Sequence, residues 1–279
     1  MIQKFKEFLN HNNGFLGATY NFLKLKKYQL RNYKTHNYRF ENNNKQINQI
    51  VKDLNKNGYH VIKNFISEND CKELIKIIND FIQNRKELIW VDEEGSDERI
   101  LGAENISEKL NSLNLNDFTK KIGSFFLQQK LELLMIMANK VNFKPNNKGS
   151  GGGWHRDSNA GQFKSLLYLS NVEKENGPLQ IIKNSNNNFL NFKIFIKLNK
   201  KFPTYRFSND EINKIVKRRD IVEITGGAGT LILFNTSMLH RGSPIKEGMR
   251  YAITNYFYPV KKISENEIKF EKRITKKIF

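Results

Sequence analysis

The chain has 279 residues, 12% of them aromatic, a formal net charge of +19 and one cysteine. Its length and its 21 Phe predict one globular domain with short extensions and exclude a disordered chain. The lone Cys71 excludes an intrachain disulfide framework and a thiolate metal cluster, and the longest apolar run, LLMIMA, is too short to cross a bilayer.

Much of the positive charge lies at the two ends. Residues 1–40 carry +7 and residues 261–279 carry +4, which leaves +8 for residues 41–260. Basic tails attract polyanions, so weak association with an anionic surface is expected of them. Because Lys and Asn are abundant throughout, composition bias explains the charge better than a nucleic-acid partner does. No secretion signal is recognisable, which favours the cytoplasm, and the sequence predicts no oligomeric state.

Helical patterns dominate the first half of the chain. Residues 1–45 are predicted to form a basic helical extension, with Ile2, Phe5 and Leu9 on one face. A helix follows from about residue 46 and ends at Gly58, and residues 59–65 read as a strand. Ser67 is the predicted N-cap of the next helix, which places Cys71 on the apolar, core-facing side.

The second half of the chain has the pattern of a β protein. The segment 88–116 is polar and irregular, and 118–127 is expected to be helical. Strands are predicted at 133–143, 163–169, 178–183, 220–224, 230–235 and 250–258. Such an order favours a β-sandwich or barrel with helices outside it. The basic stretch 189–219 is predicted to be a partly helical, lid-like insertion.

A histidine and an aspartate have the spacing of metal ligands. In GSGGGWHRDS, His155 and Asp157 are two residues apart, so an extended backbone directs both side chains to one side and Arg156 to the other. The preceding glycines let the chain turn tightly there. His240, which follows an apolar strand, is the candidate third ligand. Two histidines and one carboxylate leave coordination positions open, as in non-haem Fe(II) oxygenases.

An Fe(II) centre that activates dioxygen needs an electron donor, and the usual donor is a dicarboxylate whose distal end is held by a fixed cation. Arg250 lies ten residues after His240 and opens the strand RYAITNYFYP. We expect it on the strand next to that of His240, where its guanidinium could clamp a carboxylate.

Four segments together resemble the phytanoyl-CoA dioxygenase family of Fe(II)- and 2-oxoglutarate-dependent oxygenases. They are GYHVIKNFISENDC (58–71), WHRDS (154–158), FKSLLYLSNVEKENGPLQIIKNS (163–185) and GAGTLILFNTSMLHRGSP…GMRYAITNYFYP (227–259). The resemblance covers residues 46–260 and leaves 261–279 as a basic tail.

The resemblance implies a fold, cofactors and a reaction. The fold would be a double-stranded β-helix, a mainly β jelly roll of the cupin type with flanking helices. His155, Asp157 and His240 would bind Fe(II), and Arg250 would hold the C5 carboxylate of 2-oxoglutarate. Dioxygen would be the second co-substrate. Related halogenases have a small residue in place of the carboxylate ligand, so Asp157 favours hydroxylation of a small-molecule substrate or a related oxidation, with desaturation and cyclisation as alternatives.

Further contacts are expected around this set. Asn139 or Asn142 could donate a hydrogen bond to the C1 carboxylate of 2-oxoglutarate or to a metal-bound water. Thr254 faces the same side as Arg250, and Ser243 could reach the distal carboxylate. Trp154, beside His155, is predicted either to line the wall of the pocket or to pack beneath the glycines.

Two parts of the chain are candidates for contacting the substrate: the insertion 189–219 and Arg99. The insertion carries Tyr205, Arg206 and several lysines and arginines, which would favour an anionic substrate such as a phosphate- or CoA-bearing compound. Arg99 is a second candidate anion contact. A solvated basic surface is the alternative interpretation of both.

Two other functions compete with this one. A nucleic-acid demethylase of the same superfamily would suit the charge, but such enzymes carry a second Arg six positions after the first, where Tyr256 stands here. The other competing function is that of a metal-free β-barrel binding protein. Such a protein would not explain why the three metal ligands and the carboxylate-binding arginine are all present.

Overall fold

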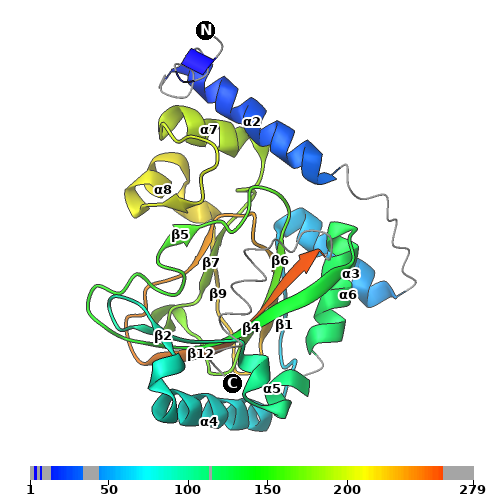
Figure 1. The fold of residues 1–279 in the computed structure, drawn as a ribbon, viewed down its shortest axis with the longest axis vertical. Helices are drawn as coiled ribbons and strands as arrows, with labels where there is room; N and C mark the ends of the chain where they lie inside the picture. Colours follow the sequence, from blue (N-terminus) through cyan, green and yellow to red (C-terminus); the bar gives the residue numbers. More distant parts are fainter. Residues whose placement is uncertain (1–2, 5–6, 8–13, 34–43, 113–114, 260–279) are drawn as a thin grey trace.

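The computed structural model describes residues 3–4, 7, 14–33, 44–112 and 115–259. Two antiparallel sheets face each other, with strand orders β1-β10-β6-β12-β4-β3-β2 and β8-β5-β11-β7-β9 (Figure 1). The large sheet contains β1 (Tyr59–Ile62), β2 (Trp90–Val91), β3 (Asp97–Leu101), β4 (Leu131–Asn142), β6 (Phe163–Tyr168), β10 (Leu231–Asn235) and β12 (Met249–Pro259). The small sheet contains β5 (Trp154–His155), β7 (Leu179–Ile182), β8 (Arg206–Phe207), β9 (Ile221–Ile224) and β11 (His240–Gly242). This is the double-stranded β-helix predicted from the sequence.

Helices α3 (Lys45–Asn57), α4 (Glu68–Asn84) and α6 (Leu115–Leu127) pack on the outer face of the large sheet (Figure 1). Their apolar stripes share one core with alternate residues of the strands, among them Ile136 and Ala138 of β4. Because strand side chains alternate, Met137 and Asn139 face the opposite way, into the space between the sheets. Because one set of alternate β4 side chains packs against the helices, the other set points into the space between the sheets.

The helix ends follow the capping residues of the sequence. Asn44 caps α3 through the backbone N–H groups of two residues, and Gly58 ends it with a φ of +84°. Ser67 Oγ accepts a hydrogen bond of 3.1 Å from the backbone N–H of Asp70 at the start of α4, as predicted.

A second group of helices covers the small sheet. They are α2 (Phe15–Tyr33), α7 (Asn188–Lys197) and α8 (Asn209–Ile215), and Figure 1 shows α2 lying along α7. The ring of Phe22 meets that of Phe192 edge-on at 5.5 Å. The helical extension predicted at the N-terminus is thus present as α2 and packs on the insertion. Ile2, Phe5, Leu9 and the tail 261–279 lie outside the described residues.

The segment 88–116 is more regular than predicted. It forms β2, β3 and α5 (Glu108–Ser112), with 3-10 turns between them. The sequence of β3 is DERIL, and its Asp97 and Arg99 face the cavity between the sheets while Ile100 faces the core. Polar residues on the inward side hide the apolar alternation by which a strand is normally recognised.

None of the helices in the described residues is both long enough and apolar enough to span a membrane.

Cys71 lies in the core, as predicted, with 1% of its surface exposed. Burial raises the pKa of its thiol to about 11, and nearby Asp70 adds to this. Only the thiolate reacts with alkylating agents, so at about pH 8 iodoacetamide should label the native protein at least about 100-fold more slowly than the urea-unfolded chain. Equal labelling rates would show that the thiol is accessible and would contradict the packing of α4.

Candidate active site

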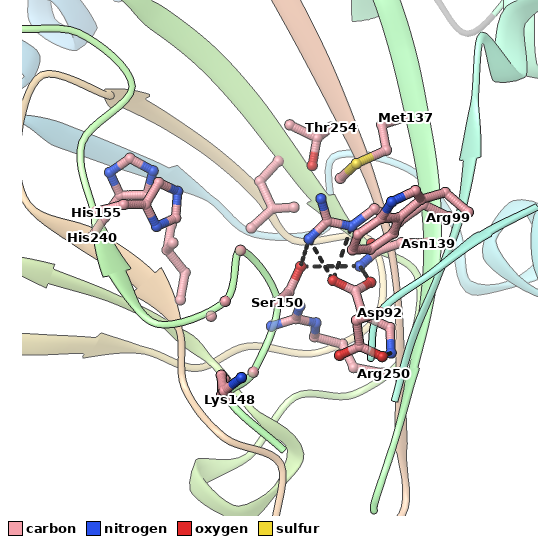
Figure 2. Close-up of a pocket in the computed structure, with 18 of the residues that line it drawn as sticks. Asp92, Arg99, Met137, Asn139, Lys148, Ser150, His155, His240, Arg250 and Thr254 are labelled. Carbon is pink, nitrogen blue, oxygen red and sulfur yellow. Dashed lines mark hydrogen bonds and ion pairs between the residues drawn. The ribbon is translucent and has the colours of Figure 1, made fainter. Parts of the chain in front are cut away.

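Three ligating side chains meet between the two sheets. His155 on β5 and His240 on β11 are directly paired on adjacent strands, with their ring centroids 4.4 Å apart (Figure 2). Asp157 follows β5, and its Oδ1 and Oδ2 lie 3.7 Å from Nε2 of His155 and of His240, respectively. The three residues offer ligand atoms within 4.8 Å of one another. Two imidazoles and one carboxylate suit Fe(II) with open coordination positions.

Backbone carbonyls orient both imidazoles. Nδ1 of His155 lies 2.8 Å from the Gly153 carbonyl, and Nδ1 of His240 lies 2.9 Å from the Met238 carbonyl. A carbonyl only accepts, so each Nδ1 donates and each Nε2 keeps a free lone pair for a metal. Burial, together with His240, lowers the pKa of His155 to about 3, and burial also lowers that of His240. Both rings are therefore neutral at neutral pH, as metal binding requires.

Lys164 is a component of the site that was not predicted. Its Nζ lies 2.9 Å from Asp157 Oδ2 and 3.9 Å from the ring centroid of Tyr256, and the residue is buried. Burial alone would raise the pKa of Asp157, but Lys164 and the two histidines hold it below its ordinary value. The carboxylate is therefore ionised and held in place. A lysine in the otherwise largely apolar strand FKSLLY was the available signal.

The glycine run allows the chain to pass close to the ligands. A side chain on Gly151, whose φ is +91°, would place its Cβ 2.5 Å from Cε1 of His155. At Gly149, with a φ of +73°, a Cβ would lie 2.2 Å from the Gly242 carbonyl oxygen. These close approaches support the predicted role of the run, which is to bring His155 to the metal position.

Arg250 lies on the facing sheet. We expected it on the strand next to that of His240, and this was wrong: Arg250 opens β12 of the large sheet, whereas His240 belongs to β11 of the small sheet. The short connection 243–248 crosses from the small sheet to the large one, which sequence spacing does not reveal, and puts the two residues on opposite walls of one cavity of about 670 Å³.

The surroundings of Arg250 leave hydrogen-bonding capacity unused. Its Nη1 donates to the Gly177 carbonyl, while its buried Nε has no partner among the described residues. The hydroxyl of Ser243 is likewise buried without a partner there, and the Ser243 carbonyl adjoins Gly177. Thr254 lines the cavity of the candidate site, whereas Ser243 lies next to the lining residue Gly242 and is not itself part of the lining. Unsatisfied buried donors of this kind fit a carboxylate.

Asn139 and Asn142 face opposite sides of β4. Asn139 lines the cavity and donates to Asp97 Oδ1 at 3.0 Å and to Ser150 Oγ at 3.3 Å (Figure 2). Asn142 donates to Glu98 and does not line the cavity. Of the two asparagines expected at the cofactor, Asn142 is therefore excluded and Asn139 is the one that lines the cavity, because the period-two alternation of a strand sends residues three apart to opposite faces.

Arg99 lines the cavity, but its charge is already paired. Its Nε donates to Asp97 Oδ2 at 2.9 Å, and its guanidinium lies 4.6 Å from the ring centroid of Trp90. Arg99 and Asp97 therefore act as a fixed polar wall beside Asn139 and Ser150 (Figure 2). A free anion contact at Arg99 does not fit this arrangement.

The remaining candidate substrate-contact residues lie either at the cavity wall or away from it. Trp154 is buried among the residues under α7 and stacks with Arg241, so it packs away from the cavity. Tyr205 also lies outside the lining. Among the basic residues of 189–219, all of which the structure describes, Arg206 alone lines the cavity. The predicted basic collar is thus reduced to one guanidinium, and Lys200 pairs with Glu211 instead.

Comparisons with known proteins place the chain in a family. The sequence profile of phytanoyl-CoA dioxygenase (PhyH) matches residues 54–250, and the chain belongs to this family. No curated protein sequence matches it significantly.

Solved structures share the fold at low sequence identity. EctD from S. alaskensis, solved with 2-oxoglutarate and 5-hydroxyectoine, is 17% identical with a TM-score of 0.58, over 81% of this chain and 80% of that one. The epimerase SnoN, solved with Fe³⁺, alpha-ketoglutarate and nogalamycin RO, is 12% identical with a TM-score of 0.58, over 77% and 84%. HygX from Streptomyces hygroscopicus, solved with nickel and 2-oxoglutarate, is 13% identical with a TM-score of 0.55, over 76% and 87%.

The predicted family and fold are confirmed by these comparisons. The prediction of iron and 2-oxoglutarate agrees with the ligands of these neighbours and with the cluster of His155, Asp157 and His240.

Proposed function

We propose that this protein is an Fe(II)- and 2-oxoglutarate-dependent dioxygenase that hydroxylates a small molecule bearing an anionic group. The observation that carries the proposal is the meeting, in one cavity, of His155, Asp157 and His240 from one wall with Arg250 from the other. A metal-free binding protein would have no use for two buried neutral imidazoles whose Nε2 atoms converge on an ionised carboxylate.

The residues present fit both cofactors. His155, Asp157 and His240 would hold Fe(II), with Lys164 keeping the carboxylate ionised and in place. Arg250 and Ser243, whose buried donors lack partners, would hold the distal carboxylate of 2-oxoglutarate, with Thr254 beside it. Asn139, whose two side-chain N–H groups already donate to Asp97 and Ser150, would support the cavity wall beside the co-substrate. When bound, these groups supply oxidative decarboxylation of 2-oxoglutarate to succinate and carbon dioxide, with the second oxygen atom of dioxygen inserted into a substrate C–H bond.

The test of this function uses a spectroscopic and a chemical readout. Anaerobic addition of Fe(II) and then 2-oxoglutarate should produce a visible metal-to-ligand charge-transfer band, and admission of oxygen should release succinate. Absence of the band with iron bound would contradict the proposal. In a substrate screen, mass spectrometry separates hydroxylation, which adds one oxygen atom, from epimerisation, which leaves the mass unchanged, and from cyclisation or desaturation, which removes two hydrogen atoms.

A free cation in the cavity wall favours an anionic substrate. Asp97 is paired with Arg99, Glu94 with Lys148 and Asp157 with Lys164. The other acidic lining residues are Asp92, which accepts hydrogen bonds from the backbone N–H groups of Ser96 and Asp97, and Glu93, which is exposed and lies 3.7 Å from Lys148. Arg206 also lines the cavity, and its guanidinium donates only to the carbonyls of Gly151 and Gly152. In the described part of the chain it forms no ion pair. It is the cavity cation still available to a substrate.

Replacing Arg206 by glutamine should therefore raise the KM for an anionic substrate by about 10-fold, because a hydrogen-bonded ion pair contributes on the order of 1–2 kcal/mol at a partly exposed site. Turnover of a neutral substrate should change much less. The matched control is Arg218→Gln, at an exposed arginine of the same insertion outside the cavity. Equal effects of the two substitutions would reject a direct contact by Arg206.

A further inference from the structure

A second cavity of about 700 Å³ lies behind the metal-binding strand. It is bounded by α2, the end of α3, the end of α6 and the loops 159–161 and 186–188. Arg156, between the metal ligands His155 and Asp157, extends into its wall, because neighbouring residues of an extended segment point to opposite sides. This space, here called the Arg156 cavity, shares no lining residue with the cavity of the candidate active site.

Arg156 is a buried cation with no counter-charge among the described residues. Its exposed fraction is 3%, and its Nη1 and Nη2 donate to Asn191 Oδ1 at 2.9 Å and to the Ser185 carbonyl at 3.2 Å. In the same part of the chain its buried Nε has no partner and no carboxylate lies at ion-pair distance from it. A buried charge without an opposite charge costs several kcal/mol, so the site favours an incoming anion.

The other residues that line the Arg156 cavity are also cationic or neutral. Lys26 is the second cation, and its ammonium donates only to the neutral side-chain oxygens of Gln29 and Asn188. Among the residues that the structure describes, no aspartate or glutamate lines the cavity, whereas amide side chains make up much of its wall. The buried side-chain N–H₂ of Asn159 and the buried Oε1 of Gln129 lack partners among the described residues. The wall thus offers two positive charges, a free amide donor and a free acceptor.

We propose that the Arg156 cavity is a second binding site, for a small dianion that bears hydroxyl groups. The dianion would match the charges of Arg156 and Lys26 and accept from Asn159, and a hydroxyl group would donate to Gln129. The volume lies within the range of small-molecule sites. A phosphorylated polyol and a hydroxy-dicarboxylate share this chemistry.

The decisive variant is Asn191→Asp, which places a carboxylate where the amide oxygen now lies 2.9 Å from Arg156 Nη1. The built-in counter-charge should weaken binding of glycerol 3-phosphate by about 10-fold or more and raise the thermal stability of the unliganded protein. The matched control is Asn213→Asp on the exposed face of α8, which adds the same charge elsewhere and should leave the affinity unchanged. Arg156→Met should remove binding without lowering stability.

Binding is measured by calorimetry on metal-free protein at low chloride, with glycerol 3-phosphate, inorganic phosphate, malate and glycerol. A site for dianions binds the phosphate ester or malate and leaves glycerol unbound, and the preference between the first two identifies the anionic group. Arg250→Lys should leave this binding intact, which separates it from the 2-oxoglutarate site. Wild-type affinity in Asn191→Asp, equal weakening in Asn213→Asp, or loss in Arg250→Lys would overturn the proposal.

Glu41, the sole acidic residue between α2 and α3 in the sequence, provides one more control. Glu41→Gln should not change the affinity for glycerol 3-phosphate. A rise in affinity would show that this side chain already neutralises Arg156 and would also overturn the proposal.

Discussion

Asp157→Ala should lower the affinity for Fe(II) by at least about 100-fold, since even residues that only support a metal ligand contribute 10–100-fold. The substitution removes the one carboxylate of the cluster and leaves the neutral imidazoles of His155 and His240. It also leaves the buried ammonium of Lys164 without its partner at 2.9 Å, which should destabilise the metal-free protein by about 3–5 kcal/mol. Anaerobic Fe(II) titration and urea unfolding measure the two effects separately.

The double variant Asp157→Ala/Lys164→Met distinguishes loss of a ligand from loss of folding. It removes both charges of the buried pair, so stability should recover towards that of the wild type while iron binding stays lost. Iron bound by Asp157→Ala as tightly as by the wild type would reject the metal assignment. Recovery of iron binding in the double variant would show that the single variant had failed through misfolding.

Arg250→Ala should raise the concentration of 2-oxoglutarate needed for half-maximal succinate release by about 100-fold, with little change in Fe(II) affinity. The guanidinium is buried, its Nε is unpaired among the described residues, and a buried charge pair contributes on the order of 2–5 kcal/mol to binding. The charge-transfer band, titrated with 2-oxoglutarate, reports the same affinity without turnover. Unchanged dependence on 2-oxoglutarate would reject the clamp.

Arg250→Lys tests the geometry of that clamp. Lysine keeps the positive charge but cannot form two parallel hydrogen bonds, so its effect should be smaller than that of alanine and still clear. Arg218→Ala, at an exposed position, is the control for loss of an arginine as such. Because Arg250 also donates to the Gly177 carbonyl, thermal stability should be compared across all three variants.

Most of the fold could be predicted because local signals and tertiary packing agree. Asn44, Gly58 and Ser67 cap helices that the apolar spacing already indicated, and the six predicted strands of the second half correspond to β4, β6, β7, β9, β10 and β12. Strand β3 was missed because its cavity-facing Asp97 and Arg99 are polar, so the usual alternation is absent. A strand whose inward side chains line a functional cavity lacks the apolar alternation by which strands are normally recognised.

The candidate site was predictable where its parts are close in sequence or belong to a known motif. The i, i+2 spacing of His155 and Asp157 is local, and the position of His240 directly after a predicted apolar strand made it the candidate third ligand. The contributions of Lys164 and Asp97 were not predictable, and the choice between Asn139 and Asn142 stayed open, since each depends on which side of a strand faces the cavity and which strands are neighbours. Trp154 was expected at the pocket wall or beneath the glycines, and strand alternation puts it in the core under α7.

The sequence by itself determined the ligand types, the class of fold and the family, because these depend on residue identity, spacing and apolar periodicity. Only the tertiary structure decided that Arg250 faces the metal ligands from the other sheet, that one basic residue of the insertion reaches the cavity, and that Arg156 is buried without a counter-charge. The physical reason is that long-range strand pairing sets distances between residues far apart in the chain, and burial, which sets their charges and unmet hydrogen bonds, exists only once those strands have packed.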